Sequence, residues 1–252
     1  MSVLTILKRN IKWRFHNAFT IVITILQPML WLVLYSAVAG QTMKNTGIEN
    51  YTAYILPGLV VLVSFSTCSS SGIMNYMMKS EGSFYRVLIA PVRRISIVLG
   101  QILEAVICTF LEVGIMGIVS SLLFSVKVAT GLIGILLIIV LVFLTSFFMA
   151  GLSYAISLIL PNEVVYETVM NAIVLPIFFL SSALFPVDEI KGVLAIAIRL
   201  NPFTHVIDAL RSLILYGNIE LAGIFNVLFL FVIMCGISFL WALYKLRKEN
   251  SL

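Results

Sequence analysis

Long apolar runs separated by short polar stretches dominate the pattern of this chain. A helix that crosses a membrane needs about 20 consecutive, mostly apolar residues. Runs of this kind are predicted at about 18–39, 52–78, 95–125, 130–160, 164–184 and 221–243. Prolines lie inside three of these runs, which is tolerated where neighbouring groups satisfy the freed carbonyl oxygens. The pattern predicts an all-α polytopic membrane protein with six transmembrane helices.

The first residues predict a helix of another kind. Leu4, Leu7 and Ile11 recur at helical spacing, while basic residues such as Lys8 fall largely on the other side. A helix over residues 2–16 is therefore expected to lie in the membrane interface, with its basic side toward the headgroups. The alternative is a plain charged flank to the first span.

The stretch 185–215 is apolar but broken twice. Apolar sequence stops at 185–189, resumes at 193–198, and stops again at Asn201-Pro202 before a further helical segment. Each apolar piece is too short to cross a bilayer. In a soluble protein the stretch would be a helical hairpin. In a membrane protein it predicts two short re-entrant helices, which need protein or a water-filled cavity to cover their backbone.

Composition decides between these two interpretations. Hydrophobic residues make up 61% of the 252 residues and charged residues only 11%, compared with about 25% charged in soluble domains. The whole chain, 1–252, is therefore expected to be one membrane domain. Eleven of the sixteen basic residues fall on one side of the predicted spans: Lys8, Arg9, Lys12, Arg14, Lys79, Arg86, Arg93, Arg94, Lys245, Arg247 and Lys248.

This charge bias predicts the orientation of the protein. Basic residues concentrate in cytoplasmic segments, so both termini are expected in the cytoplasm and the stretch 185–215 on the outer side. The net charge of +5 then reflects membrane orientation, and no nucleic-acid partner is expected. The expected location is a bacterial plasma membrane.

The loop 79–94 is the largest one predicted on the cytoplasmic side. Ser83 is expected to cap a short helix that ends before Pro91, because the residue before a proline avoids helical geometry. Phe84 and Tyr85 would give this helix exposed aromatic surface, suited to docking into a groove on a partner. The alternative is a connector that lies against lipid headgroups.

Four polar residues inside the predicted spans are candidates for a transport pathway. Glu104 and Glu112 are eight residues apart and so lie about 80° apart around a helix. An ionised group near mid-bilayer costs about 3 kcal/mol and usually faces the bundle interior or water. Ser66 and Ser70 belong to a hydroxyl-rich segment that could line a pathway. For all four, packing between helices is the alternative interpretation.

Catalytic and metal-binding constellations are missing from the sequence, and no metal site is expected. Cys68, Cys108 and Cys235 lie in separate apolar runs and are predicted to be packing residues. No Gly-x-x-x-x-Gly-Lys-Ser/Thr phosphate loop occurs, so ATP binding by that mechanism is excluded. An active transporter with this sequence would take its energy from another subunit. A channel or scaffold remains an alternative, whereas an intramembrane enzyme has no supporting residues.

Four motifs carry a family resemblance. In chain order they are Gln27-Pro28; Glu81-Gly82-Ser83 with Ala90-Pro91-Val92; Ser181-Ser182-Ala183-Leu184-Phe185-Pro186; and Leu200-Asn201-Pro202-Phe203-Thr204 with Asp208-Ala209-Leu210-Arg211. Together they resemble the membrane permease subunits of ABC type-2 (ABC-2) exporters, most of all the bacterial multidrug-export permeases. The resemblance covers nearly the whole chain. Ser182 stands where glycine is usual, and Lys191 where proline is usual.

The resemblance implies a set of partners and a function. Two ABC ATP-binding subunits would carry ATP and Mg, with no cofactor bound by this chain, and a second permease copy or a related permease would complete the complex in the lipid bilayer. Hydrophobic or amphiphilic substrates (drugs, peptides or lipid-like molecules) would be exported. The alternative substrate is a polysaccharide or glycolipid.

The resemblance also implies roles for two groups of residues. The loop 79–94 would couple the chain to the ATPase through Glu81, Gly82, Ser83, Phe84, Tyr85, Arg86, Leu88 and Pro91. The re-entrant helices of 185–215 would close the outer end of the pathway through Phe185, Pro186, Asn201, Pro202, Thr204, Asp208 and Arg211. Asp208 and Arg211, three residues apart on one helix face, are expected to stabilise the closed outer cap. Pairing only with each other is the alternative.

Overall fold

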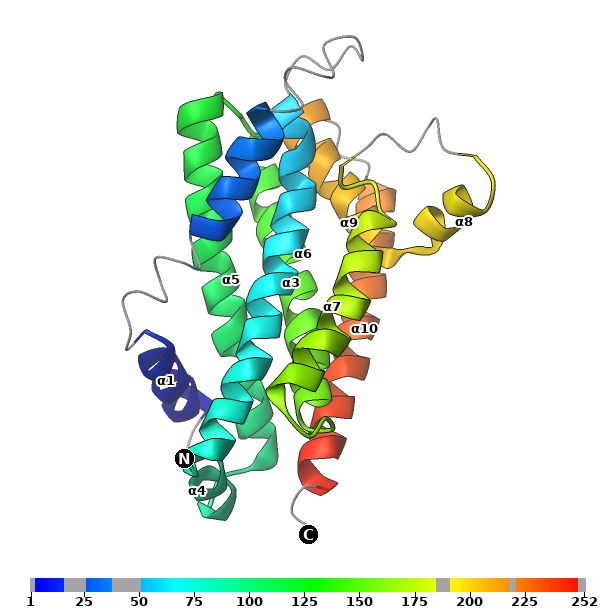
Figure 1. Ribbon diagram of the computed structural model, residues 1–252. Helices are drawn as coiled ribbons and strands as arrows, with labels where there is room; N and C mark the ends of the chain where they lie inside the picture. Colours follow the sequence, from blue (N-terminus) through cyan, green and yellow to red (C-terminus); the bar gives the residue numbers. More distant parts are fainter. Residues whose placement is uncertain (1–2, 16–25, 38–50, 185–190, 218–220, 249–252) are drawn as a thin grey trace.

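The computed structural model describes residues 3–15, 26–37, 51–184, 191–217 and 221–248. All regular secondary structure in these ranges is helical, which confirms the predicted all-α class. Most helices run along a common direction in an elongated bundle (Figure 1). They are α1 (Val3–Arg14), Leu26–Ala37, α3 (Tyr51–Ser80), α4 (Ser83–Ile89), α5 (Arg94–Phe124), α6 (Gly131–Ser157), α7 (Glu163–Phe179), α8 (Val193–Leu200), α9 (Pro202–Arg211), the π-helical turn η1 (Ser212–Tyr216) and α10 (Leu221–Lys248).

Four of these helices are long and apolar enough to cross a membrane, namely α3, α5, α6 and α10. Their bounds follow four of the predicted spans to within a few residues. The helices α8 and α9–η1 form a pair bent by 76° at Asn201, which is either one broken span or a re-entrant element. The described residues thus contain four or five candidate spans, and the predicted number of six is not established.

The two remaining predicted spans are represented by shorter helices. The first is described only as Leu26–Ala37, and its other predicted positions lie outside the described residues. The fifth, α7, ends at Phe179, so the predicted end at Leu184 was wrong. At this end the side-chain amide of Asn201 donates to the carbonyl oxygens of Ile177 and Leu180, at 2.7 and 2.8 Å, and so satisfies groups that the end of the helix leaves free.

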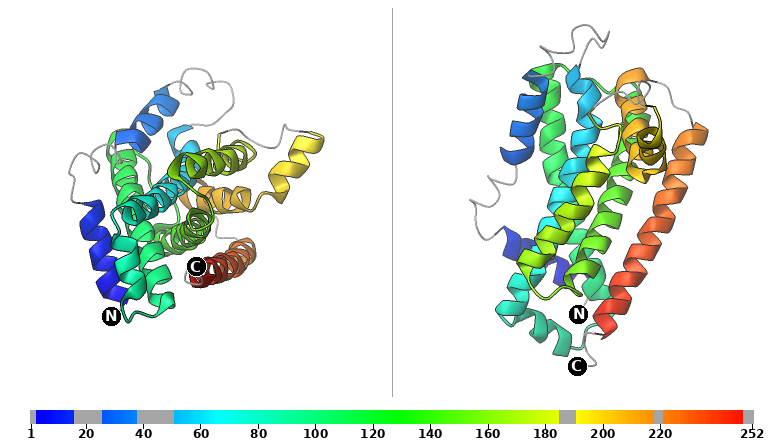
Figure 2. Two further views of the ribbon diagram at one scale, coloured as in Figure 1. Left: turned by 60° about the horizontal axis from the view of Figure 1, so that its bottom comes forward. Right: turned by 45° about the vertical axis from the view of Figure 1, so that its right-hand side comes forward.

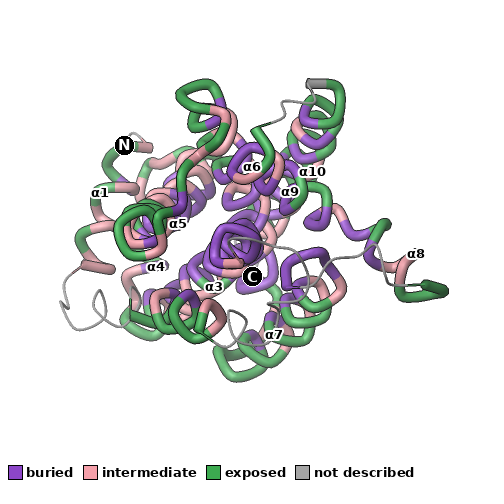
Figure 3. Tube along the Cα trace, turned by 90° about the horizontal axis from the view of Figure 1, so that it is seen from above, coloured by how far each residue is buried: buried purple, intermediate pink, exposed green. Residues whose placement is uncertain are grey.

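The helix α3 occupies the centre of the bundle. Its apolar stretch is 83% buried, compared with 28% for α10 (Figure 3). It packs against α5, α6, α7 and α9. At Gly58 the backbone of α3 approaches the segment after α7 so closely that a Cβ atom would lie 2.7 Å from the Cβ of Ala183. Since α10 exposes most of its apolar surface, it has the character expected of a lipid-facing helix.

The two ends of the bundle are formed by different helices. The helices α1 and α4 and the C-terminal end of α10 lie together at one end, and α8 and α9 lie in the opposite half, with α8 standing away from the bundle (Figures 1 and 2). The eleven basic residues of the predicted cytoplasmic side all belong to the α1 and α4 end or to the helix ends beside it. We call this the inner end and the opposite one the outer end.

Candidate functional site

A pocket of about 480 Å³ lies between the helix Leu26–Ala37, α3 and α7, with one residue from α5. Three of the four predicted pathway residues line it: Glu112, Ser66 and Ser70. Glu104 does not. The other lining residues are Gln27, Pro28, Trp31, Tyr35, Leu59, Leu62, Val63, Phe65, Thr67, Ser69, Ile73, Glu167, Asn171, Val174, Leu175, Phe178 and Phe179.

Glu112 is the one acidic group of α5 at this pocket. Its side chain is only 6% exposed, and Thr67 Oγ1 donates a hydrogen bond of 2.6 Å to its Oε2. Thr67 Oγ1 also lies 2.9 Å from the carbonyl oxygen of Val63, one turn earlier on α3, so the two acceptors share its single proton. The carboxylate of Glu112 is therefore held toward α3 at the wall of the pocket.

Glu104 lies about two turns nearer the inner end of α5 and belongs to a separate polar cluster. Its Oε1 is 3.1 Å from Arg14 Nη1, and Ser71 Oγ donates to its Oε2 at 2.8 Å. Cys108 contributes a longer contact of 3.4 Å. The cluster continues through Gln101, which donates to Ser71 Oγ at 3.1 Å. These contacts occupy the carboxylate of Glu104 within the protein.

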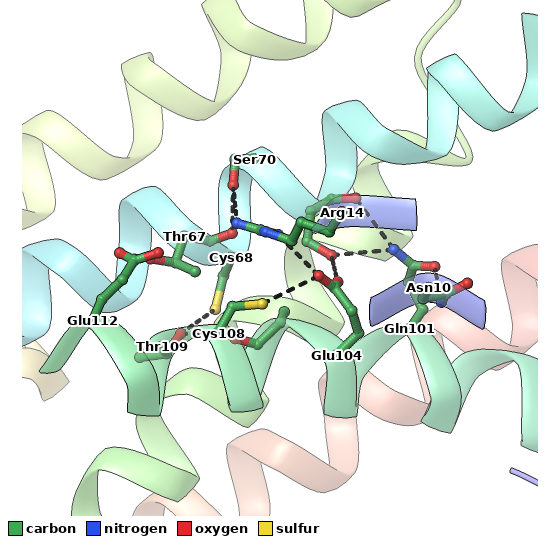
Figure 4. Close-up of polar contacts among 12 residues, drawn as sticks. Asn10, Arg14, Thr67, Cys68, Ser70, Gln101, Glu104, Cys108, Thr109 and Glu112 are labelled. Atoms are coloured by element: carbon green, nitrogen blue, oxygen red, sulfur yellow. Dashed lines mark hydrogen bonds and ion pairs between the residues drawn. The ribbon is translucent and has the colours of Figure 1, made fainter. Parts of the chain in front are cut away.

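Arg14 reaches from α1 into the bundle, between α3 and α5 (Figure 4). Besides pairing with Glu104, its Nη2 donates to Ser70 Oγ at 2.8 Å, so it touches a residue of the pocket. Burial lowers the pKa of the Arg14 guanidinium, but the acidic groups around it, Glu104 first among them, together raise that pKa above its ordinary value. Arg14 is therefore a charged group inside the protein, whereas the sequence places it only among the basic residues of the cytoplasmic side.

The helix α1 is fixed to α5 over much of its length. Ile6 packs against Gly100, and Asn10 Nδ2 donates to Gln101 Oε1 at 3.0 Å. Leu4 and Lys8 remain exposed. A helix is present where the interfacial helix was predicted, and one of its faces packs on α5.

The helix α4 forms the predicted inner loop, with two corrections. Its cap is Gly82, in a left-handed conformation with φ of 72°, and Ser83 Oγ instead donates to the carbonyl of Met78 at 3.2 Å. Ser83 cannot cap because it is already the first helical residue. Phe84 is only 4% exposed and lies under the Lys79 ammonium, so it was wrongly predicted as exposed surface.

The remaining coupling candidates are accessible. Tyr85 is 54% exposed and Ile89, which the sequence did not single out, is 83% exposed. Glu81, Arg86 and Pro91 are also exposed, and Leu88 is half-buried. The helix ends at Ile89, which confirms the predicted end before Pro91. The exposed surface of α4 is therefore a mixed apolar and basic one.

At the outer half, Asn201 and Pro202 begin α9 as predicted. Asn201 Oδ1 accepts a hydrogen bond from the Phe203 backbone N–H at 3.0 Å, and Pro202 is the first helical residue. Phe203 packs edge-on against Phe65 of α3, with ring centroids 4.6 Å apart. Thr204 is buried, and its hydroxyl has no hydrogen-bond partner among the described residues. Phe185 and Pro186 lie outside the described residues.

The side chain of Arg211 joins α9 to two other segments. Its Nη1 lies 3.0 Å from Asp208 Oδ1, and its Nε donates to the Tyr54 carbonyl at 3.2 Å. Its Nη2 donates to the Ser182 carbonyl, and Ser182 Oγ donates to Asp208 Oδ1 at 2.6 Å. We call Tyr54, Ser182, Asp208 and Arg211 the Arg211 cluster. Asp208 and Arg211 do pair, but Arg211 also binds α3 and the segment after α7.

Several residues of the pocket were not predicted as site residues. Glu167 and Asn171 lie one turn apart on α7, and Trp31 and Tyr35 lie one turn apart on the first helix, with stacked rings 5.5 Å apart. Spacing of this kind could have placed each pair on one helix face. It could not have shown that both faces meet at one pocket.

The described residues contain no group of three His, Cys, Asp or Glu side chains able to hold a metal ion. Cys68, Cys108 and Cys235 are buried free thiols on three different helices. The described structure does contain a pocket with polar and aromatic lining residues.

Comparison with known proteins gives a consistent result. Residues 1–215 match the family described as ABC-2 type transporter. The chain is 28% identical to the transport permease ycf38 of Cyanophora paradoxa, over 79% of this chain and 69% of the relative. It is 25% identical to Nodulation protein J of Rhizobium leguminosarum bv. trifolii, over 85% of this chain and 82% of the relative.

Proposed function

The chain belongs to the ABC-2 type transporter family, and we propose that it is the permease subunit of an ATP-driven exporter of hydrophobic or amphiphilic substrates. It is a membrane protein and a transport subunit, and permeases of this family act with an ABC ATP-binding subunit. The observation that carries the proposal is the pocket between the helix Leu26–Ala37, α3 and α7, which holds polar and aromatic groups inside an apolar bundle.

Two ATP-binding subunits and a second permease copy, or a related permease, complete the proposed complex. The ATP-binding subunit docks on α4, where Tyr85, Arg86 and Ile89 are exposed. This assignment is supported by the position of α4 at the inner end, beside α1 and the end of α10 (Figure 1). The protein lies in the plasma membrane with both termini in the cytoplasm, as the basic residues of the inner end favour.

The Arg211 cluster closes the outer end of the pathway in this proposal. Replacing Arg211 by alanine removes three hydrogen bonds to groups on different segments. A hydrogen bond from a charged donor contributes about 1.5–3 kcal/mol. The Arg211→Ala variant is expected to leak more substrate without ATP, measured as passive efflux from proteoliposomes. Arg211→Lys keeps the charge but not the fork of donors, so an intermediate leak is expected.

Arg199→Ala is the matched control, because Arg199 is exposed on α8. Its passive efflux should equal that of the unaltered protein. Unchanged passive efflux in Arg211→Ala would contradict the claim that the Arg211 cluster closes the outer end of the pathway.

A second substrate class, polysaccharide or glycolipid, is favoured by the uncharged hydrogen-bonding groups of the pocket. Gln27, Ser66 and Asn171 suit a ligand rich in hydroxyl groups. The test is ATP hydrolysis by the reconstituted complex of permease and ATP-binding subunit, measured against a panel of drug-like amphiphiles, peptides and glycolipids. Stimulation by amphiphiles is expected. Stimulation of ATP hydrolysis by glycolipids alone would favour the second substrate class. If no member of the panel stimulates ATP hydrolysis, both substrate classes are contradicted.

A further inference from the structure

We propose that the pocket binds amphiphilic cations, with the positive group toward the inner end and the apolar body toward the outer end. This inference rests on the proposed transport function and names the substrate class for the same pocket. It follows from three observations on the lining residues, namely their order along α3, their order along the other two helices, and their charge.

Along α3, the lining changes from apolar to polar. This helix runs from the outer to the inner end of the bundle (Figure 1). Its lining residues begin with apolar side chains from Leu59 to Phe65, continue with hydroxyl side chains from Ser66 to Ser70, and end with the apolar Ile73. The hydroxyl groups of this wall therefore lie in its inner half, beside Ile73, and its outer half is apolar.

The other two helices run in the opposite direction and show the opposite order. On α7, Glu167 and Asn171 come first, followed by Phe178 and Phe179. On the helix Leu26–Ala37, Gln27 precedes Trp31 and Tyr35. Because these helices are antiparallel to α3, the reversal places polar groups at the same end on all three walls. The pocket is thus polar toward the inner end and aromatic toward the outer end.

The titratable side chains of the pocket lining are acidic. Its described lining contains Glu112 and Glu167 but no lysine, arginine or histidine. Arg14 touches Ser70 of the lining, but its charge is compensated by Glu104 at 3.1 Å. Charges interact more strongly in a low-dielectric bundle than in water, so an anionic ligand is disfavoured here and a cation is favoured.

The aromatic outer half is compatible with the same ligand class. Aromatic rings offer apolar contact area, and their faces attract cations. A volume of about 480 Å³ lies within the usual range for small-molecule sites, about 300–1,000 Å³. An apolar body carrying one ammonium or phosphonium group matches this combination of size, polarity and charge.

The experiment compares two probes of closely similar size and shape but opposite charge, tetraphenylphosphonium and tetraphenylborate. Equilibrium dialysis of each labelled probe against the purified permease–ATPase complex gives its affinity, after subtraction of binding to protein-free micelles. Tetraphenylphosphonium should bind and tetraphenylborate should not. Glu112→Gln should weaken tetraphenylphosphonium binding about tenfold. Glu167→Gln should weaken it about threefold, because that carboxylate is exposed and better screened.

Glu163→Gln is the matched control. Glu163 lies one turn before Glu167 on the same helix, is exposed, and does not line the pocket. Its substitution removes the same charge from the same helix, so an unchanged affinity shows that the effect belongs to the pocket. Glu167→Gln alters an exposed side chain and is expected to fold even where Glu112→Gln does not.

Two further outcomes separate this inference from the transport function. Equal binding of both probes, or an unchanged affinity for tetraphenylphosphonium in both pocket variants, overturns the cation assignment even where ATP drives transport of another amphiphile. Conversely, if tetraphenylphosphonium binds and depends on Glu112 as expected, but ATP drives no transport of any amphiphile, the binding site stands and the transport function is contradicted.

Discussion

Replacing Arg14 by alanine is expected to destabilise the protein by about 3–5 kcal/mol, because it leaves the carboxylate of Glu104 buried without its cation. Glu104 is fully buried, and Arg14 is the one cation among the described residues that pairs with it. The substitution also removes the donor to Ser70. The loss should be visible as a lowered midpoint of thermal unfolding of the purified protein in detergent, and as detachment of α1 in a protease-accessibility assay.

A double variant and a surface variant make this test specific. In Arg14→Ala/Glu104→Gln the buried charge is gone, so much of the lost stability should return, although the polar amide still lacks one partner. Lys12→Ala removes an exposed basic residue from the same helix and should change little. If Arg14→Ala unfolded at the same temperature as Lys12→Ala, the buried ion pair would have no part in holding α1 to the bundle.

The second large effect is expected at α4. Tyr85 and Ile89 are both exposed at the inner end and one turn apart, so their side chains form one apolar surface. Truncating a central interface residue typically costs about 2 kcal/mol or more, which is about a thirtyfold loss of affinity. Tyr85→Ala/Ile89→Ala is therefore expected to lose the ATP-binding subunit during co-purification and to lose ATP-driven transport, while the permease itself remains folded.

The choice of Tyr85 and Ile89 over Phe84 is part of this prediction. Phe84 lies on the buried side of α4, so Phe84→Ala should lower the stability of the permease as well as its affinity for the partner. Leu132→Ala, at an exposed apolar position at the start of α6, serves as the matched control. Full retention of the ATP-binding subunit by Tyr85→Ala/Ile89→Ala would place the docking surface elsewhere.

The sequence predicted the elements that local chemistry determines. Four long apolar runs became α3, α5, α6 and α10, since length and hydropathy suffice to define such helices. Pro91 and the pair Asn201-Pro202 ended and began helices as predicted, because proline restricts the backbone wherever it stands. Glu112 was predicted as a pathway candidate, and it lines the pocket.

Other features depend on which helix faces pack against one another, and the hydrophobic periodicity of the sequence does not show this. Arg14 was counted with the basic residues of the cytoplasmic side, yet its side chain enters the bundle, where it pairs with Glu104, ninety residues later. Phe84 and Tyr85 are neighbours in an apolar segment, and the fold buries the first and exposes the second. The pocket likewise needs three helices to come together, so Asn171 and Trp31 gave no signal on their own.

The central claim is that this chain moves substrate only when a separate ATP-binding subunit hydrolyses ATP. The most direct measurement is uptake of a lipophilic cation into inside-out vesicles that contain the whole complex. It compares the intact ATP-binding subunit with one whose phosphate-loop lysine is replaced by alanine. The account predicts ATP-dependent uptake with the intact subunit and background uptake with the altered one. Equal, ATP-independent uptake in both would contradict the account and favour a channel.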